Sequence, residues 1–237
     1  MDQRTALLYA KLKPFKALVN KTSGFIRWAL EQVENPYVAC SFGKDSAVML
    51  HLVLQYKPEI PVRFSEQIVT KYLDDYETVI KWWRINFNIN LQRVYVLRKE
   101  IKSEVEKASS EDDFSQRKSL DKGNWDSFFV GIRAEESVGR RINLKKNGMF
   151  AKQKNGRIKI SPLAWWKTED IIAYTYQNHL PVLSRYNKFG FNDRTTAGLP
   201  PKWVYNVLED TLLKLRNTDP SAYNNLLLTF EDLKYYV

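Results

Sequence analysis

A short apolar run leads directly into a small polar loop and then into an apolar segment with helical spacing. The run extends from Pro36 to Ser41, the loop reads Phe42-Gly43-Lys44-Asp45-Ser46, and the helical segment follows from 47 to 54. This order predicts a buried strand, a tight turn and a buried helix. A strand that passes straight into a helix is the unit from which parallel sheets are built, so this feature restricts the fold to the α/β class.

The same alternation continues along the chain. Residues 61–65, 92–97 and 126–132 have the composition of buried strands, and 73–87 has helical spacing. Alternating strands and helices predict a mostly parallel sheet with helices on both faces and right-handed crossovers. Residues 98–124 are dense in charge and poor in apolar side chains, which predicts an exposed helix followed by a mobile loop that would suit a lid.

Helices are also expected towards both ends of the chain. The apolar spacing in 5–34 predicts two helices, with breaks near Pro14 and near Ser23-Gly24. Thr168-Glu169-Asp170 has a capping residue and two acidic residues that suit the start of a further helix. Pro200-Pro201 precedes two more predicted helices.

The loop after the first strand has the composition of a phosphate cradle. Gly43 lets the backbone turn closely around an anion, the first amides of the next helix point at it, and Lys44 adds a compact positive charge. The hydroxyls of Ser41 and Ser46 can donate hydrogen bonds to phosphate oxygens. The spacing differs from the Gly-x-x-x-x-Gly-Lys-Ser/Thr loop of common nucleoside triphosphatases. A strand-to-helix turn with a capping serine would explain the same residues, and this alternative stays open.

A second charged motif follows the strand at 126–132. It contains Arg133, Glu136, Ser137 and Arg140. The two arginines offer planar, permanent charges for oxygen anions, and Glu136 can orient an arginine or help to hold a metal ion that bridges phosphates. Because loops after parallel strands share one edge of the sheet, we expect both motifs to face one crevice. The alternative is a surface network of arginine and glutamate at a helix start.

The net charge of +10 is concentrated in one stretch. Ser137 to Thr168 holds nine Lys and Arg and no Asp or Glu, whereas the rest of the chain holds 28 basic and 27 acidic residues. Lys154-Asn155-Gly156 lies between two short strand-like runs, which predicts a hairpin, so the basic stretch is expected to include a projecting ribbon. A polyanion, either nucleic acid or an acidic protein, is the expected partner of the segment from Arg140 to Lys159. A simple solvated face is the alternative.

Composition excludes several classes of protein. A chain of 237 residues that is 44% hydrophobic is expected to be globular, and it has neither a run long enough to cross a bilayer nor a secretory signal. A cytoplasmic location without membrane contact is therefore expected. One cysteine and two histidines give little material for a zinc site or an iron–sulfur cluster. Cys40 is expected to be buried and inert, and His51 and His179 to be structural.

These motifs resemble, in their order, the phosphoadenosine phosphosulfate (PAPS) reductase-like family of adenine nucleotide alpha hydrolases, the PP-loop ATP pyrophosphatases. The resemblance also rests on Ser161-Pro162-Leu163-Ala164-Trp165-Trp166-Lys167-Thr168-Glu169-Asp170, with Leu180-Pro181 and Tyr186 after it. The first loop and the residues after it also resemble the small subunit of ATP sulfurylase. The likeness implies a Rossmann-like, HUP-type sheet. It suggests a division into a helical extension at 1–34, an adenine-nucleotide domain at 35–198 and a second helical extension at 199–237.

The resemblance also implies a site. An adenine nucleotide would bind to Ser41, Phe42, Gly43, Lys44, Asp45, Ser46, Arg133, Glu136 and Ser137. Lys44, Arg133 and Arg140 would be the catalytic cations, and Asp45 is a candidate Mg²⁺ ligand. Related reductases carry a nucleophilic cysteine near the carboxyl terminus, and this sequence ends Leu233-Lys234-Tyr235-Tyr236-Val237, so thiol-dependent reduction of PAPS is not expected.

Three functions therefore remain open. The leading one is cleavage of the α–β phosphate bond of ATP with Mg²⁺, activating an unknown acceptor. A second is a nucleotide-binding regulatory subunit that engages nucleic acid or a partner protein through the basic hairpin. The third is an ATP sulfurylase-like subunit that works with a separate GTPase subunit. An oligomer or a hetero-complex would be compatible with each of them.

Overall fold

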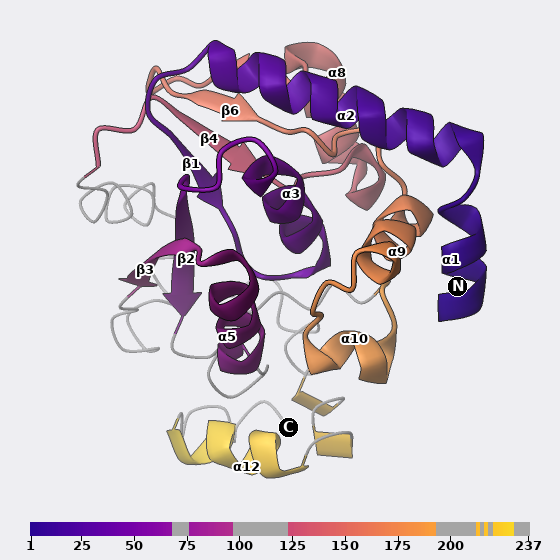
Figure 1. The fold of residues 1–237 in the computed structure, drawn as a ribbon. Coiled ribbons are helices and arrows are strands. Elements are labelled where there is room, and N and C mark those ends of the chain that lie inside the picture. Colours follow the sequence, from indigo (N-terminus) through magenta and orange to yellow (C-terminus); the bar gives the residue numbers. More distant parts are fainter. Residues whose placement is uncertain (68–75, 97–122, 193–211, 214–215, 218–219, 230–237) are drawn as a thin grey trace. The chain divides into compact units, whose positions relative to one another are not determined.

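Strands and helices alternate along the described part of the chain (Figure 1). The computed structural model describes residues 1–67, 76–96, 123–192, 212–213, 216–217 and 220–229. Its elements are α1 (Gln3–Tyr9), α2 (Lys13–Glu31), β1 (Pro36–Ala39), α3 (Lys44–Leu54), β2 (Pro61–Gln67), α5 (Tyr76–Phe87), β3 (Asn90–Val96), β4 (Ser127–Val130), the 3₁₀ turn η1 (Ala134–Glu136), α8 (Val138–Asn147), β5 (Phe150–Lys152), β6 (Ile158–Ile160), α9 (Thr168–Gln177), α10 (Ser184–Phe189) and α12 (Pro220–Thr229).

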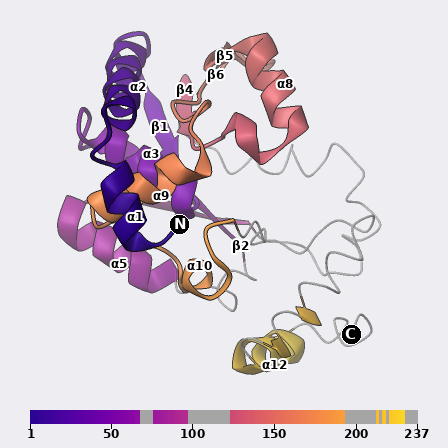
Figure 2. The same ribbon diagram turned by 90° about the vertical axis from the view of Figure 1, so that its right-hand side faces the viewer.

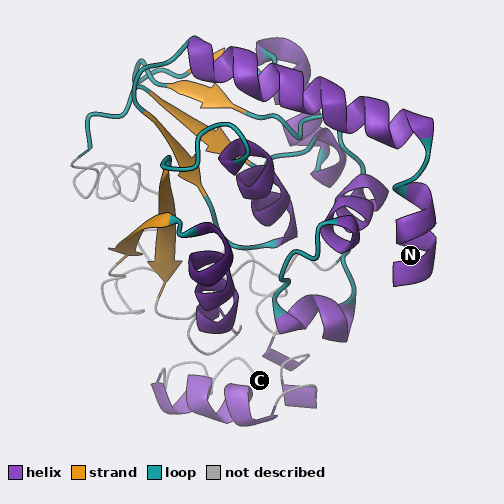
Figure 3. Cartoon of the chain, viewed as in Figure 1, coloured by secondary structure: helices purple, strands orange, loops and turns teal. Residues whose placement is uncertain are grey.

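The strands form one sheet in the order β3-β2-β1-β4-β6-β5. β1 pairs in parallel with β2 and β4, β4 pairs in parallel with β6, and β5 alone among these pairs is antiparallel. Figure 3 shows the strands side by side with α3 lying against them. This is the mostly parallel α/β sheet that the alternating sequence predicts, and it has the Rossmann-like form that the family resemblance implies. β1 and β4 are adjacent in the middle of the sheet and run in parallel, so the residues that follow them lie at the same edge.

Helices cover both faces of the sheet. On one face, the Phe150 ring of β5 packs edge-on against Trp28 of α2, with ring centroids 5.1 Å apart. On the other face, Lys159 of β6, whose register partner is Ala151, donates a hydrogen bond to Asn143 of α8. Neighbouring residues of a strand point to opposite faces, so α2 and α8 lie on opposite sides of β5 and β6. Figure 2 shows the same arrangement.

The predicted break in the first helical segment is right at Pro14 and wrong at Ser23-Gly24. α1 ends at Tyr9 and α2 begins at Lys13, with the proline in its first turn, where a missing amide costs nothing. α2 then continues through the glycine. Phe15, Thr22, Ile26 and Ala29 are buried at helical spacing along it, and this burial outweighs a glycine penalty of about 1 kcal/mol.

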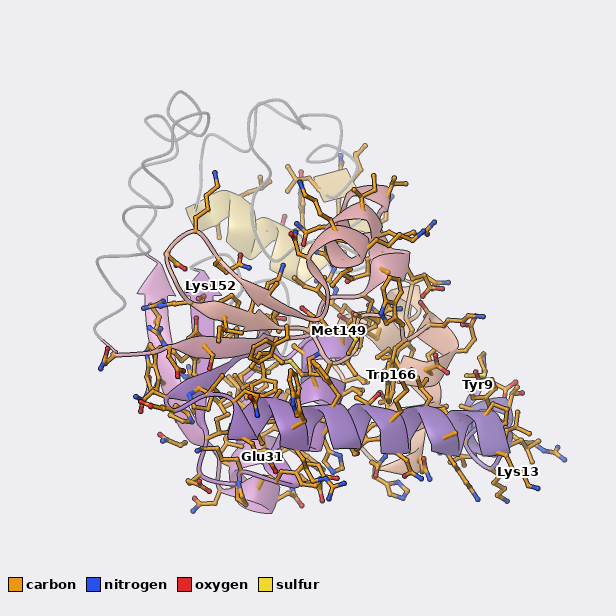
Figure 4. The ribbon with its side chains drawn as sticks, turned by 90° about the horizontal axis from the view of Figure 1, so that it is seen from above. Tyr9, Lys13, Glu31, Met149, Lys152 and Trp166 are labelled. Carbon is orange, nitrogen blue, oxygen red and sulfur yellow. The ribbon has the colours of Figure 1, made fainter. Side chains whose placement is uncertain are left out.

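The amino-terminal helices are fastened to the sheet domain by polar contacts. Tyr9 Oη donates to Asp170 Oδ1 at 2.9 Å, and Trp166 Nε1 donates to Thr22 Oγ1 at 2.8 Å. In Figure 4, Tyr9 and Trp166 lie alongside α2 towards the end marked by Lys13. α1 and α2 are therefore part of the same compact unit as the sheet, which comprises Met1–Phe64, Glu77–Arg93 and Gly123–Leu183.

The hairpin is confirmed, but it does not project. β5 and β6 pair around a turn in which Gly156 has φ 84°, a backbone conformation that favours glycine. β6 also pairs with β4, so the hairpin forms the edge of the main sheet and is no free ribbon. The helix α8 before it was not predicted. Its large apolar residues are Val138, Ile142 and Leu144, which are too few to give a clear helical pattern.

The second unit comprises Ser65–Tyr76, Val94–Lys122 and Ser184–Val237. Its described helices are α10 and α12, and the ring of Tyr186 in α10 stacks on Phe191 at 5.7 Å. The predicted lid segment and the region around Pro200-Pro201 lie mostly outside the described residues. The three-part division of the chain stays a prediction. None of the helices in the described ranges is long and apolar enough to cross a membrane.

Candidate functional site

The loop between β1 and α3 is shaped by a buried phenylalanine. Phe42 has φ 54° and is fully buried, and its ring packs edge-on against Phe64 with centroids 5.3 Å apart. Gly43 has φ −70° and ψ 163°, an ordinary extended conformation. The left-handed residue of the turn is therefore Phe42, whereas the sequence argument gave the tight turn to Gly43. A positive φ is costly for a large side chain, and the burial of this ring offsets that cost.

Two hydroxyls meet inside this loop. Ser46 Oγ donates to the carbonyl of Gly43 at 3.0 Å and lies 3.1 Å from Ser41 Oγ. Ser46 therefore closes the first turn of α3, which is the structural role left open by the sequence. The backbone amides of Lys44, Asp45 and Ser46 occupy the first helical turn, where no intrahelical acceptor exists and the helix dipole is positive. Such amides form an anion-binding position.

Asp45 lies between two cations. Lys44 Nζ is 2.7 Å from Asp45 Oδ2, and Arg133 Nε is 2.6 Å from Asp45 Oδ1. The side chains of Lys44, Asp45 and Arg133 are 7%, 12% and 2% exposed. The ion pair from Arg133 joins the loop after β1 to the segment after β4, across 88 residues of sequence.

Arg133 is fully engaged by the protein. Beyond Asp45, Nη1 donates to Glu135 Oε2 at 2.6 Å and to the carbonyl of Trp166 at 3.3 Å, and both Nη atoms lie 3.4 Å from Thr168 Oγ1. Burial alone lowers the pKa of Arg133, but the charge of Asp45 and the hydrogen bond to Glu135 outweigh it and raise the pKa overall. The permanently charged guanidinium therefore links the loop after β1, the segment after β4 and the start of α9.

A close backbone contact supports the same junction. A Cβ atom placed on Gly131 would lie 2.9 Å from the carbonyl carbon of Asp45 and 2.9 Å from the amide nitrogen of Ser46. Only a residue without a side chain lets the end of β4 approach the start of α3 this closely. Gly131 and the Asp45–Arg133 ion pair thus hold the two sequence motifs together at one edge of the sheet.

Arg140 and Glu136 form a separate, more exposed pair. Glu136 Oε2 accepts the Arg133 backbone amide at 2.8 Å and makes an ion pair with Arg140, whose side chain is 46% exposed. Ser137 Oγ accepts the Arg140 amide at 3.1 Å and caps α8. Burial raises the pKa of Glu136, but the hydrogen bonds from Arg133 and Arg140 lower it overall. Among the described residues, Arg140 forms its hydrogen bond and ion pair with Ser137 and Glu136 and none with the 41–46 loop.

Glu135 and Thr168 were missed as members of the site. Glu135 Oε2 accepts from Arg133, from the Thr168 amide at 2.7 Å and from Thr168 Oγ1 at 2.9 Å. Burial raises the pKa of Glu135, but these hydrogen bonds from Thr168 and Arg133 lower it overall. The signal available in the sequence was a carboxylate two residues after an arginine, together with a threonine at a helix start. Nothing local indicated that the two would meet.

Cys40 directly precedes the loop and His51 lies further along α3, and burial favours the uncharged form of both. Burial raises the pKa of the Cys40 thiol to about 12, and its sulfur accepts the Phe42 amide at 3.4 Å. Burial lowers the pKa of His51 to about 4, and its Nδ1 is 2.9 Å from Tyr174 Oη. In the described ranges, no group of three or more His, Cys, Asp or Glu side chains could hold a metal ion.

Residues 35–192 match the family model of the phosphoadenosine phosphosulfate reductase domain. The chain belongs to this family, within the PP-loop adenine nucleotide alpha hydrolases. Among curated proteins, it is 34% identical over 179 residues to a phosphoadenosine 5'-phosphosulfate reductase of Photobacterium profundum, covering 66% of this chain and 65% of the relative. A reductase of Vibrio campbellii is 30% identical over 176 residues, covering 65% of this chain and 63% of the relative. The chain thus spans less than two thirds of the length of these two relatives.

Solved structures show the same fold. A PAPS reductase from Candida auris, solved as a phosphate complex, has a TM-score of 0.51 at 18% identity and covers 73% of this chain and 90% of its own. The U34-tRNA thiolase NcsA from Methanococcus maripaludis, solved with its 4Fe-4S cluster, has a TM-score of 0.51 at 15% identity and covers 94% and 81%. These identities support a shared fold and no more.

Proposed function

We propose that this protein binds ATP with the phosphates on the loop from Ser41 to Ser46. The observation that carries the proposal is the ion pair between Asp45 and Arg133, which fixes the first turn of α3 against the end of β4. Three amides and the positive end of a helix dipole then lie at one position, next to the Lys44 side chain, whose ammonium pairs with Asp45. Membership of a nucleotide-binding family supports the same assignment.

The proposed reaction is cleavage between the α- and β-phosphates. A nucleophilic acceptor forms a bond to the α-phosphorus, the bridging P–O bond breaks, and pyrophosphate leaves with the bonding electrons. Lys44 and the helix amides stabilise the charge that develops on the phosphate oxygens. Arg140, half-exposed at the start of α8, is the cation that can turn towards a ligand. Arg133 is given a positioning role, because its donors already meet protein oxygens.

Mg²⁺ enters this proposal as part of the substrate, MgATP. The two carboxylate oxygens of Asp45 are taken by Lys44 and Arg133, so this carboxylate does not fit the oxygen-rich octahedral shell that Mg²⁺ requires. Phosphate oxygens and water supply that shell instead. No step of the proposed reaction is routed through a metal ion held by the protein.

Thiol-dependent reduction of PAPS, the activity named for the curated relatives, is the main competitor. Cys40 is the one cysteine in the sequence, and its buried thiol, with a pKa of about 12, is a poor nucleophile. The proposal therefore assigns no redox step to this chain.

Product analysis with α-labelled ATP and Mg²⁺ tests the reaction. We expect AMP, or an adenylylated acceptor, together with pyrophosphate, and a large loss of both binding and turnover in Lys44→Met. Lys57→Met, which removes a lysine beyond the far end of α3, is the matched control. Release of ADP alone would exclude the mechanism. Thiol-dependent release of sulfite from PAPS would replace it with reduction, and sulfate-dependent exchange of pyrophosphate into ATP would assign an ATP sulfurylase-like activity.

A further inference from the structure

The basic stretch of the sequence forms the β5 edge of the sheet. Eight Lys and Arg side chains occur between Arg140 and Lys159, with no Asp or Glu among them. They lie on α8 and on the β5–β6 hairpin, which are adjacent in Figure 2. Lys152 lies on the same face of β5 as Phe150, which packs against Trp28 of α2, whereas Met149 packs against the cluster around Leu144 of α8. The excess charge of the chain is therefore collected along one margin of the fold.

Half of these cations already have protein partners. Arg140 pairs with Glu136, Arg141 donates to the carbonyl of Ala134, Lys159 donates to Asn143, and Arg157 is also engaged. The other four are exposed and make no hydrogen bond or ion pair with described residues. These β5-edge lysines are Lys145, Lys146, Lys152 and Lys154.

The packing of α8 directs its lysines outward. Leu144 is buried in a small cluster with Ala134 and Ala164, next to Met149. Lys145 and Lys146, on the following residues, are exposed. α8 therefore presents a fixed inner face to the domain and leaves its carboxyl-terminal lysines at the surface.

The backbone of β5 adds donors to the same margin. Gln153 donates to Arg157, and Met149 accepts from Ser161, so the residues at these alternate positions face β6. The amides of Phe150 and Lys152 then point to the open edge, because alternate residues of an antiparallel strand face opposite neighbours. The carbonyls of Phe150 and Lys152 point to the same edge, so the backbone there offers both donors and acceptors.

We propose that the β5-edge lysines form a nucleic-acid binding surface that follows the sheet margin from the end of α8 to the hairpin turn. A margin whose charged side chains are all cationic complements a phosphate backbone, which is negatively charged along its whole length. Lysine is suited to such sequence-independent contacts, as a compact charge on a flexible stem. The proposal is independent of the nucleotide site and of the reaction assigned to it.

Fluorescence anisotropy with the full-length chain tests the surface. The probes are a fluorescein-labelled RNA of about 30 nucleotides and a DNA duplex of the same length, titrated over a range of salt concentrations. The test variant is K145Q/K146Q/K152Q/K154Q. The matched control, K11Q/K13Q/K16Q/K21Q, removes four exposed lysines of the amino-terminal helical region and gives the same net charge.

Removing four phosphate contacts should weaken binding by about two orders of magnitude near physiological salt and reduce the slope of log K against log salt by roughly 3. The control should stay within a few-fold of the wild type. Absence of binding by the wild type, or equal losses in the two variants, would overturn the proposal. Equally tight binding of polyglutamate would replace it with an acidic protein partner.

Edge-strand lysines can also guard a sheet against self-pairing. If that were their role, the test variant would self-associate in size-exclusion chromatography while its nucleic-acid affinity stayed at the wild-type value, and this result too would refute the surface.

Discussion

Replacing Gly131 by alanine should force apart the two loops that form the candidate site. The new methyl group would lie 2.9 Å from two backbone atoms, the carbonyl carbon of Asp45 and the amide nitrogen of Ser46. Carbon atoms in contact prefer about 3.5–4.0 Å, so one of the two backbones must shift by more than half an ångström. Neither contact is with a flexible side chain that can turn away. Overpacking of this kind costs about 1–3 kcal/mol.

Gly139→Ala is the matched control, because it makes the same chemical change in the neighbouring helix α8. A Cβ atom at Gly139 meets nothing within 4 Å. Alanine should therefore stabilise α8 by about 0.5–1 kcal/mol, through its higher helix propensity. The two variants are thus expected to change the free energy of unfolding in opposite directions.

Urea unfolding and ATP titration calorimetry measure the two consequences. Gly131→Ala should lower the free energy of unfolding and weaken ATP binding by at least tenfold, since the amides of the first helical turn lose their alignment. Gly139→Ala should bind ATP as the wild type does. If Gly131→Ala were as stable as Gly139→Ala and bound ATP equally well, the close junction of the two loops would have no functional meaning.

Three further predictions concern buried charged and titratable groups. Arg133→Met should lower the free energy of unfolding by about 3–5 kcal/mol, because it leaves the Asp45 and Glu135 carboxylates without the buried cation that they share. The double variant with Asp45→Asn should lose less than the sum of the single losses, and strict additivity in urea unfolding would argue against the pairing. His51 has its pKa lowered from 6.5 to about 4 by burial, so the unfolded chain binds its proton first as pH falls. The free energy of unfolding should therefore fall by about 3 kcal/mol between pH 6.5 and pH 4 because of this group. His51→Gln should flatten the free energy of unfolding over this pH range relative to the wild type. Cys40 should resist a thiol reagent at mildly alkaline pH in the folded chain and react in concentrated guanidinium, whereas fast labelling of the native protein would contradict its burial.

Local patterns predicted the framework of the fold. β1, the following loop and α3 are recognisable because an apolar run, a glycine and a second apolar run lie next to one another. The β5–β6 hairpin is recognisable from Asn155-Gly156 between two short strand-like runs. These features depend on residues that are close in sequence, and the structure confirms the α/β class and the hairpin for that reason.

Features that depend on distant packing were missed. α8 has few apolar residues because its inner face rests mainly on Leu144, so its sequence pattern is weak. α2 continues through Gly24 because its buried side chains are held by the domain. In the candidate site, Arg133 was expected to face a phosphate, and the structure surrounds it with protein oxygens instead. Its partners Glu135 and Thr168 are brought together only by the parallel pairing of β4 with β6 and the turn after it.

The buried contacts of Arg133 join residues that are translated at different times. Asp45 leaves the ribosome 88 residues before Arg133, and Thr168 follows Glu135 by a further 33. At about 5–20 residues per second, the loop after β1 is exposed roughly ten seconds before its last anchor has been translated. A nascent chain halted before Thr168 would therefore lack the hydrogen bonds that Thr168 makes with Arg133 and Glu135. The ATP site proposed above would then be complete only after Thr168 has been translated.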